Sequence, residues 1–248
     1  MDGDKTGESA ESYASRSFSP LSGHAAAVTN SGKAVTWATS SQGDRFGQLG
    51  RGKGARLSPA AVEGRPERVT AAFTGGGKDS GHTALLSEAG HLFVAGCDRW
   101  QQLGLCSPGT GAAGYTWEGG RIWRSEFKRN GAIEELLGEG GTVRDVALGA
   151  DHTVVLSGNQ TDVFSWGRGK SGQLGSRGAP FVSAPCRADG LSEKPGGDRI
   201  SAVCALADCS ATLAADGEVM KTAGKCSRAL LDGFVECKRA ARERGLIK

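Results

Sequence analysis

A short segment led by a histidine recurs along the chain, and this recurrence limits the folds that the chain can adopt. Three copies begin at His24, His82 and His152, and a fourth, more divergent copy has Cys209 at the same position. Consecutive leading residues are 58, 70 and 57 positions apart. A period of this size suits a propeller blade of four strands better than a helical solenoid. The repeat therefore predicts an all-β chain built from about four similar units.

Each copy has the pattern of a β-hairpin. Short apolar runs flank turns at residues 30–32, 88–90, 158–159 and 216–217, which are rich in residues that tolerate the left-handed backbone of a hairpin turn. The chain has 40 glycines, about twice the usual 7% share. Because glycine weakens the interiors of helices and strands but suits tight turns, this composition favours many short strands.

The motifs around each hairpin give the repeat a recognisable form. The third copy contains His-Thr at 152–153, Trp-Gly at 166–167 and Gly-Gln-Leu-Gly at 172–175. The second copy departs from this pattern with Ala95 in place of tryptophan and Gln101 in place of glycine. The pattern resembles the repeat of the RCC1 (regulator of chromosome condensation) family. This resemblance implies an all-β, RCC1-like β-propeller with about four recognisable repeat units.

The resemblance covers roughly residues 20–230 and implies a structural role for the repeated residues. Buried histidines would bond backbone groups of a neighbouring strand, so that no polar atom is stranded in the core. The glycines would occupy positions that a Cβ atom would forbid, and the leucine of Gly-Gln-Leu-Gly would fill the space between blades. The residues expected to build the repeat are His24, His82, His152, Trp37, Trp166, Gly47, Gly50, Gly104, Gly172 and Gly175.

The sequence divides into three expected parts. Residues 1–19 are polar and slightly acidic, which predicts a disordered N-terminal arm. Residues 20–234 are expected to form the propeller, with an insertion at 107–141, and residues 235–248 to form a basic tail. The family usually forms a closed ring of seven blades, which needs a longer chain. Four copies therefore predict a partial or small propeller, and an open arc would expose sheet edges that we expect another chain to cover.

The insertion at 107–141 contains the candidate partner-binding residues. Aromatic and arginine side chains are enriched at the energetic centres of protein interfaces, and both types are concentrated here. The alternative is that the segment forms the outer strands of the second blade, with Trp117 and Trp123 packed inside it. A short helix is expected at residues 132–137. The candidates are Tyr115, Trp117, Arg121, Trp123, Arg124, Lys128 and Arg129.

The sequence contains no convincing catalytic, metal-binding or cofactor-binding motif. Residues 74–79 resemble a phosphate loop, but Ala72 replaces its first glycine and Asp79 replaces the Ser/Thr that binds magnesium. The seven cysteines form no C-x-x-C pair, and their odd number predicts reduced thiols without a disulfide framework. We therefore expect no enzyme activity, cofactor or metal. We expect an intracellular protein, cytoplasmic or nuclear, with an organellar location left open.

These features favour a non-catalytic scaffold for protein–protein interaction, as a subunit of a multi-subunit assembly. The family resemblance implies two alternatives. One is a guanine-nucleotide exchange factor for a small GTPase, with the insertion at 107–141 as the wedge that displaces the nucleotide. The other is chromatin or nucleic-acid binding, which a net charge of only +3 and an acidic N-terminal arm disfavour. No apolar run approaches the ~20 residues of a membrane span.

Overall fold

The structure, a computed structural model, describes residues 13–19, 22–52, 57–64, 67–106, 116–118, 121–176, 180–193, 197–226 and four positions of the C-terminal tail (239, 242, 243 and 245). The described chain forms four antiparallel sheets. The first consists of β1 (Tyr13–Ser19), β2 (His24–Thr29), β3 (Ala34–Ala38) and β4 (Ala60–Ala61). The second consists of β5 (Val69–Gly75), β6 (His82–Ser87), β7 (Leu92–Cys97), β9 (Arg121–Arg129) and β8 (Thr116–Glu118).

The other two sheets follow in the same way. The third consists of β10 (Val143–Leu148), β11 (His152–Ser157), β12 (Val163–Arg168) and β13 (Phe181–Arg187). The fourth has β14 (Ala202–Leu206), β15 (Cys209–Leu213) and β16 (Val219–Gly224). Each leading residue, His24, His82, His152 or Cys209, begins the second strand of its sheet. The four sheets therefore coincide with the four copies of the repeat.

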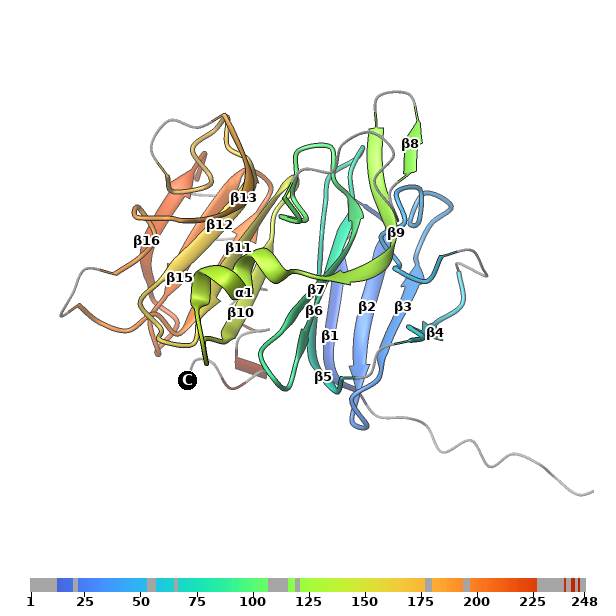
Figure 1. Ribbon diagram of the computed structural model, residues 1–248, viewed down its shortest axis with the longest axis horizontal. Coiled ribbons are helices and arrows are strands. Elements are labelled where there is room, and N and C mark those ends of the chain that lie inside the picture. Colours follow the sequence, from blue (N-terminus) through green and yellow to red (C-terminus); the bar gives the residue numbers. More distant parts are fainter. Residues whose placement is uncertain are drawn as a thin grey trace, which may run out of the picture.

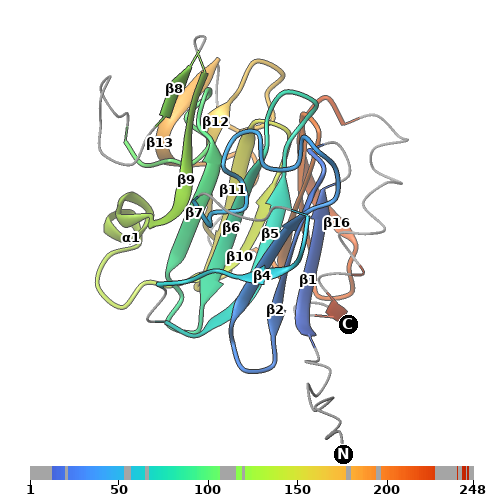
Figure 2. The same cartoon turned by 90° about the vertical axis from the view of Figure 1, so that its right-hand side faces the viewer.

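The sheets stand side by side as an open arc. Figure 1 shows the first sheet at one end of the molecule and the fourth at the other. Viewed from the first sheet, the remaining sheets lie behind it one after another (Figure 2). The first strand of each sheet contacts the first strand of the next, so β1, β5, β10 and β14 form the inner side of the arc. This arrangement is part of a β-propeller, as the repeat predicted.

Apolar layers between successive sheets form the core. The layer between the second and third sheets contains the fully buried Leu92, Leu103 and Trp166. Full burial of one leucine side chain such as Leu92 stabilises the fold by roughly 1.5–3 kcal/mol. Leu103 belongs to the second Gly-Gln-Leu-Gly-like turn, so its place between two sheets confirms the expected role of that leucine.

The N-terminal arm is shorter than predicted. Residues 13–19 form β1, which pairs along its length with β2, from Tyr13 opposite Thr29 to Ser19 opposite His24. The segment is rich in serine and lacks the apolar alternation of a typical strand, but the first sheet needs an inner strand and this segment supplies it. Residues 1–12 lie outside the described part of the chain, so the prediction for them stays a prediction.

Within the insertion at 107–141, residues 116–118 and 121–129 form the outer strands of the second sheet, which agrees with the strand part of the alternative interpretation. β9 pairs with β7, and β8 pairs with β9. Helix α1 (Gly131–Leu137) follows and confirms the expected helix. Asn130 caps this helix by accepting a hydrogen bond from the Ile133 amide at 3.1 Å, and its amide group donates to the carbonyl of Leu103 at 2.9 Å. Ile133 is fully buried, which fixes the helix to the core.

A disulfide joins Cys209 to Cys226 in the fourth sheet. The expectation of reduced thiols throughout is therefore wrong for this pair. Cys209 lies opposite Gly224 in the β15–β16 pairing, which brings Cys226, two residues farther, to a Cα–Cα distance of 5.1 Å. That distance is within the range that a disulfide spans, and sequence spacing alone does not reveal it. Cys97 and Cys204 are buried and lie outside this disulfide.

Candidate interaction surface

A buried hydrogen bond from the repeated histidine joins each sheet to the next. In the first sheet, His24 Nε2 lies 2.9 Å from Oγ1 of Thr83, which belongs to the second sheet. The Thr83 hydroxyl donates to the carbonyl of Gln48 at 2.6 Å, so its oxygen can only accept from His24. This arrangement assigns the proton to Nε2 of His24. The sequence predicted a backbone partner for the histidine, and the structure gives it a hydroxyl on the neighbouring sheet.

The same contact recurs at the next two junctions. His82 Nε2 lies 3.4 Å from the Thr153 hydroxyl, and His152 Nε2 lies 2.8 Å from the Ser210 hydroxyl. Burial lowers the pKa of His24 to about 4, that of His82 to about 3 and that of His152 to about 4, so all three rings are uncharged at neutral pH. We call this series of contacts the histidine ladder. It holds the sheets at a fixed spacing.

The histidine ladder stops in both end sheets. The residue after the leading histidine is Thr83 in the second sheet and Thr153 in the third, but it is Ala25 in the first. In the fourth sheet the leading residue is Cys209, which has no imidazole and is held in the disulfide. A further sheet at either end would therefore have to pack without this hydrogen bond.

The last glycine of each Gly-Gln-Leu-Gly-like turn lies against a large side chain in the apolar layer between its own sheet and the next. Gly50 faces the ring of Phe127, Gly104 faces the ring of Trp166, and Gly175 faces Leu191. These glycines have φ near +65°, and a Cβ atom at Gly104 would lie 2.5 Å from the Trp166 indole nitrogen. The structure thus explains why these positions need glycine.

Two tryptophans of the repeat differ in their surroundings. Trp166 is fully buried, and its indole N–H donates to the carbonyl of Gln102 in the preceding sheet at 2.8 Å. Trp37 occupies the equivalent place in the first sheet, opposite Ala25, and is partly exposed. Phe127 from β9 takes the place of a tryptophan against Gly50, which is a substitution that the sequence pattern did not indicate.

The predicted partner-binding residues separate into packing and surface groups. Trp123 makes an edge-to-face contact with Phe46 of the first sheet, with ring centroids 6.3 Å apart. Arg129 donates to Glu134 at 2.7 Å, and Lys128 is exposed. Arg124 is partly buried on the same strand. Tyr115 and the side chains of Trp117 and Arg121 lie outside the described part of the structure.

Three exposed cations that the sequence did not single out occupy equivalent places on successive sheets. Arg45, Arg99 and Lys170 each stand three residues before the glutamine of a Gly-Gln-Leu-Gly-like turn. All three follow the third strand of a sheet, so they lie at one edge of the arc, which we call the turn face. Trp100, partly exposed, has the charged groups of Arg99, Arg168 and Lys170 at 5.3–5.6 Å from its ring.

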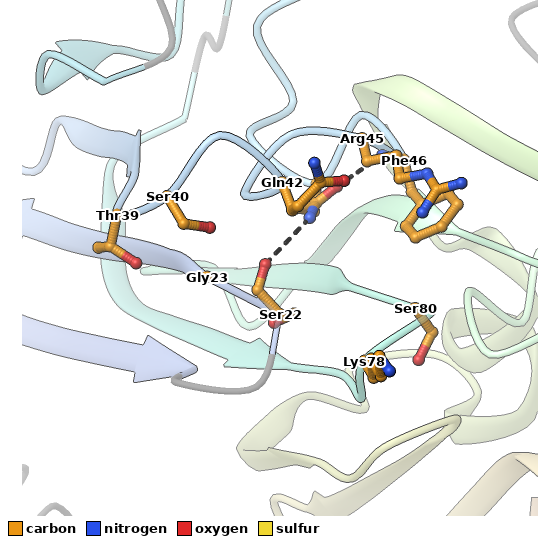
Figure 3. Close-up of a pocket in the computed structure, with 10 residues that line it drawn as sticks. Ser22, Gly23, Thr39, Ser40, Gln42, Arg45, Phe46, Lys78 and Ser80 are labelled. Atoms are coloured by element: carbon orange, nitrogen blue, oxygen red, sulfur yellow. Dashed lines mark hydrogen bonds between the residues drawn. The ribbon is translucent and has the colours of Figure 1, made fainter.

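A hollow of about 340 Å³ opens on the turn face between the first and second sheets (Figure 3). Its wall combines two cationic side chains with several hydroxyls, and none of the described residues that line it is a carboxylate. The lining residues are Ser22, Gly23, Thr39, Ser40, Gln42, Arg45, Phe46, Gln48, Lys78 and Ser80.

Comparison with known families agrees with the repeat read from the motifs. Two descriptions of the "Regulator of chromosome condensation (RCC1) repeat" match residues 143–173 and 162–213. The chain is a divergent RCC1-like protein. The matched residues cover the third sheet and most of the fourth, where the His-Thr and Gly-Gln-Leu-Gly motifs of the third copy lie.

Similar proteins share the RCC1-like fold over part of their length. "Protein RCC2 homolog" from Danio rerio is 32% identical over 167 residues, which cover 61% of this chain and 30% of that protein. "RCC1 domain-containing protein 1" from Homo sapiens is 26% identical over 192 residues, or 69% of this chain and 49% of that protein. Prp20p from Saccharomyces cerevisiae superposes with a TM-score of 0.58 at 18% identity, over 90% of this chain and 44% of the other. The RCC1-like chain thus spans less than half the length of these relatives.

Two further features are absent from the residues that the structure describes. No group of three or more potential metal ligands comes together among them. No helix in the same part of the RCC1-like chain is long and apolar enough to cross a membrane.

Proposed function

We propose that this RCC1-like chain is a non-catalytic protein-interaction module that binds its partner through the turn face. The observation that carries the proposal is the row of exposed cations, Arg45, Arg99 and Lys170, placed at the same position on three successive sheets. Arginine and tryptophan supply much of the binding energy at protein interfaces, and Trp100 lies within this row. Because the histidine ladder fixes the spacing of the sheets, the row is preorganised for a partner.

The charges of this row favour an acidic partner surface. Arg168, beside the row, lies 3.7 Å from both Asp151 and Asp208, which offset its charge. Arg45, Arg99 and Lys170 make no ion pair with any residue that the structure describes. Asp151 partly offsets the charge of Arg99, but all three cations are exposed and can pair with carboxylates on another protein. Such complementarity speeds association and selects partners.

Charge reversal tests the proposal. The triple variant Arg45→Glu, Arg99→Glu and Lys170→Glu changes only exposed side chains, so it should fold normally. The matched control is Lys33→Glu, an exposed lysine in the β2–β3 turn at the opposite ends of the strands. Partners captured with the wild-type chain are identified by mass spectrometry, produced in pure form and titrated against each variant.

The proposal expects the triple variant to lose at least tenfold in affinity for the purified partner, and the control to bind within twofold of wild type. The wild-type affinity should also fall with rising salt, because the attraction between exposed charges is screened. A triple variant that binds every purified partner as tightly as wild type contradicts the proposal.

Nucleotide exchange on a small GTPase is the second candidate function. It is favoured by the likeness to Prp20p, whose structure is described together with its binding to Gsp1p and histones. Residues 121–129 lie inside the second sheet as β9, so this part of the insertion is not free to act as a wedge. A nucleotide-release assay against a panel of purified GTPases tests this candidate. Accelerated release by the wild-type chain supports exchange, and unchanged release across the panel counts against it.

A further inference from the structure

We propose that the hollow between the first and second sheets binds a phosphorylated serine or threonine side chain of the protein partner. This inference rests on the proposed function for the source of the ligand, and it assigns the chemistry of one contact within that interface. Arg45, which belongs to the row of cations, also lines the hollow.

The charge of the hollow matches a phosphate dianion. Arg45 comes from the loop after β3 and Lys78 from the loop between β5 and β6, so two sheets each supply one cation (Figure 3). Among the residues that the structure describes, neither side chain has an ion-pair partner. The neighbouring Asp44 is 7% exposed, and its carboxylate accepts a hydrogen bond from the Leu49 amide at 3.2 Å. A phosphomonoester carries a charge of about −1.5 to −2 at neutral pH, which two cations balance better than they balance a carboxylate.

Polar groups that the fold does not use line the same hollow. The side chains of Thr39, Ser40 and Gln42 make no hydrogen bond within the described chain, and each can donate one to a phosphate oxygen. Ser22 and Ser80 are different, because their hydroxyls already bond His24 and the Ala150 carbonyl, respectively. The hollow therefore offers three uncommitted donors and two cations to three terminal phosphate oxygens.

The wall of the hollow is held in place before any ligand arrives. The Gln48 side chain accepts from the Phe46 amide at 2.8 Å and donates to the Ser22 carbonyl at 3.4 Å. Gly23 has φ +64°, and a Cβ atom there would lie 2.3 Å from the Ser40 hydroxyl oxygen. Glycine at this position thus leaves room for that hydroxyl.

This site differs from the nucleotide phosphate loop that residues 74–79 resemble. A nucleotide loop holds phosphate with backbone amides at the start of a helix. Here the glycine-rich segment joins two strands, because β5 ends at Gly75 and β6 begins at His82. The proposed contacts come from side chains, and a single phosphate on a protein side chain is the ligand class that they suit.

The test titrates the full chain with N-acetyl-O-phosphoserine amide and follows backbone amides by NMR. We expect saturable binding with the largest shifts at Gly23, Ser40 and Lys78. The double variant Arg45→Ala and Lys78→Ala should weaken binding at least tenfold. The control is Arg99→Ala with Lys170→Ala, which removes two cations from the same face outside the hollow and should leave the affinity within twofold.

Two further probes and a second variant sharpen the test. Ser40→Ala should weaken phosphoserine binding about threefold or more while leaving the thermal unfolding midpoint unchanged, which separates a binding defect from misfolding. N-acetyl aspartate amide should bind at least tenfold more weakly than the phosphoserine probe. Inorganic phosphate should compete with the phosphoserine probe for the hollow. The inference is overturned by an absence of saturable binding, by equal affinity for the aspartate probe, or by equal affinity of the double variant.

The outcome also separates this inference from the proposed function. The phosphoserine titration needs no protein partner. An absence of phosphoserine binding would therefore overturn the phosphate site without bearing on whether the turn face binds a protein. Charge reversal at Arg99 and Lys170, which lie outside the hollow, examines the interaction module by itself. A partner that still binds after phosphatase treatment but not after that reversal supports the module and overturns the phosphate site.

Discussion

His24 Nε2 donates to the Thr83 hydroxyl across the junction between the first and second sheets, over 2.9 Å. Both side chains are fully buried, and the hydroxyl donates its own hydrogen bond to the Gln48 carbonyl. Three polar groups from two sheets therefore satisfy one another's hydrogen bonding. The contact ties the position of one sheet to the loop of its neighbour, and it predicts that the sheets lose stability together when it is removed.

Replacing Thr83 by valine should destabilise the chain by about 2–3 kcal/mol. The substitution keeps the side-chain shape but leaves the His24 N–H and the Gln48 carbonyl buried without this partner, and each unsatisfied group costs about 1–3 kcal/mol. Thr222→Val, at an exposed strand position, is the matched control and should change the free energy of unfolding by less than about 0.5 kcal/mol. Urea unfolding of both variants gives the comparison. Equal midpoints for the two variants would contradict the proposed role of the hydroxyl.

Acidification should destabilise the fold through the three ladder histidines. Their folded pKa values are lowered to about 4, 3 and 4, whereas the unfolded value is near 6.5. Between these values the unfolded chain binds more protons than the folded chain. The stabilisation is therefore complete above pH 6.5 and is lost as the pH falls toward 4, by up to about 1.4 kcal/mol per pH unit for each histidine.

Urea unfolding at pH 7.0, 6.0 and 5.5 measures this dependence. His152→Asn is expected to lower the slope of the free energy of unfolding against pH, because it removes one of the titrating groups. A free energy of unfolding that stays constant over this interval counts against neutral, buried histidines.

Replacing Gln101 by glycine should stabilise the chain by about 0.5–1 kcal/mol. Gln101 has φ +60°, a conformation that costs a side-chain-bearing residue roughly 1–2 kcal/mol, and glycine relieves most of that strain. Gly47 holds the equivalent position in the first copy with φ +66°, so the reverse change Gly47→Gln should destabilise. Thermal unfolding midpoints of both variants should move in opposite directions, and a lower midpoint for Gln101→Gly would refute the strain argument.

Replacing Gly104 by alanine should destabilise by about 3 kcal/mol. The new Cβ atom would lie 2.5 Å from the Trp166 indole nitrogen, and φ is +65°, so steric overlap adds to backbone strain. Gly131→Ala at the start of α1 is the control, because no described atom outside its chain neighbours and its own helix backbone lies within 4 Å of its Cβ position. That variant should be neutral or slightly stabilising. Loss of the tryptophan fluorescence of the native state in urea reports both.

Opening the Cys209–Cys226 disulfide should lower stability by about 3 kcal/mol. The two cysteines are 17 residues apart, and closing a loop of that size restricts the unfolded chain by about this amount. Peptide mapping without reductant should recover the two cysteines as one linked fragment. A Cys209→Ser and Cys226→Ser variant should then unfold at the same urea concentration as the reduced wild type, and at a lower concentration than the oxidised wild type.

The sequence predicts the sheets well because each copy carries its own turn and strand signals. The hairpins around residues 30–32 and 158–159 form as expected, and α1 begins one residue before the predicted start. These features depend on neighbouring residues, which a local pattern captures. β1 was missed because Tyr13–Ser19 shows no apolar alternation, and only its pairing with β2 makes it a strand.

Contacts between copies were harder to predict. The partner of His24 lies 59 residues away, and no local pattern indicates that a hydroxyl on the next sheet accepts its hydrogen bond. Phe127 and Leu191 do the packing that Trp166 does at another junction, although they come from different places in their copies. The sequence shows that Arg45, Arg99 and Lys170 each stand three residues before a glutamine. That all three are exposed on one face of the arc follows only from the order of the strands in the sheets.

Ala25 and Cys209 have a consequence for engineering the arc. Ala25 lacks the hydroxyl that Thr83 and Thr153 supply at the same position, and Cys209 lacks the imidazole of the other leading residues. The two ends of the arc therefore cannot form a ladder contact with each other. Ala25→Thr and Cys209→His together would equip one terminus as an acceptor and the other as a donor. Copies of such a variant could then meet head to tail through one histidine bond at each junction, and each junction would have to offset the loss of the Cys209–Cys226 disulfide.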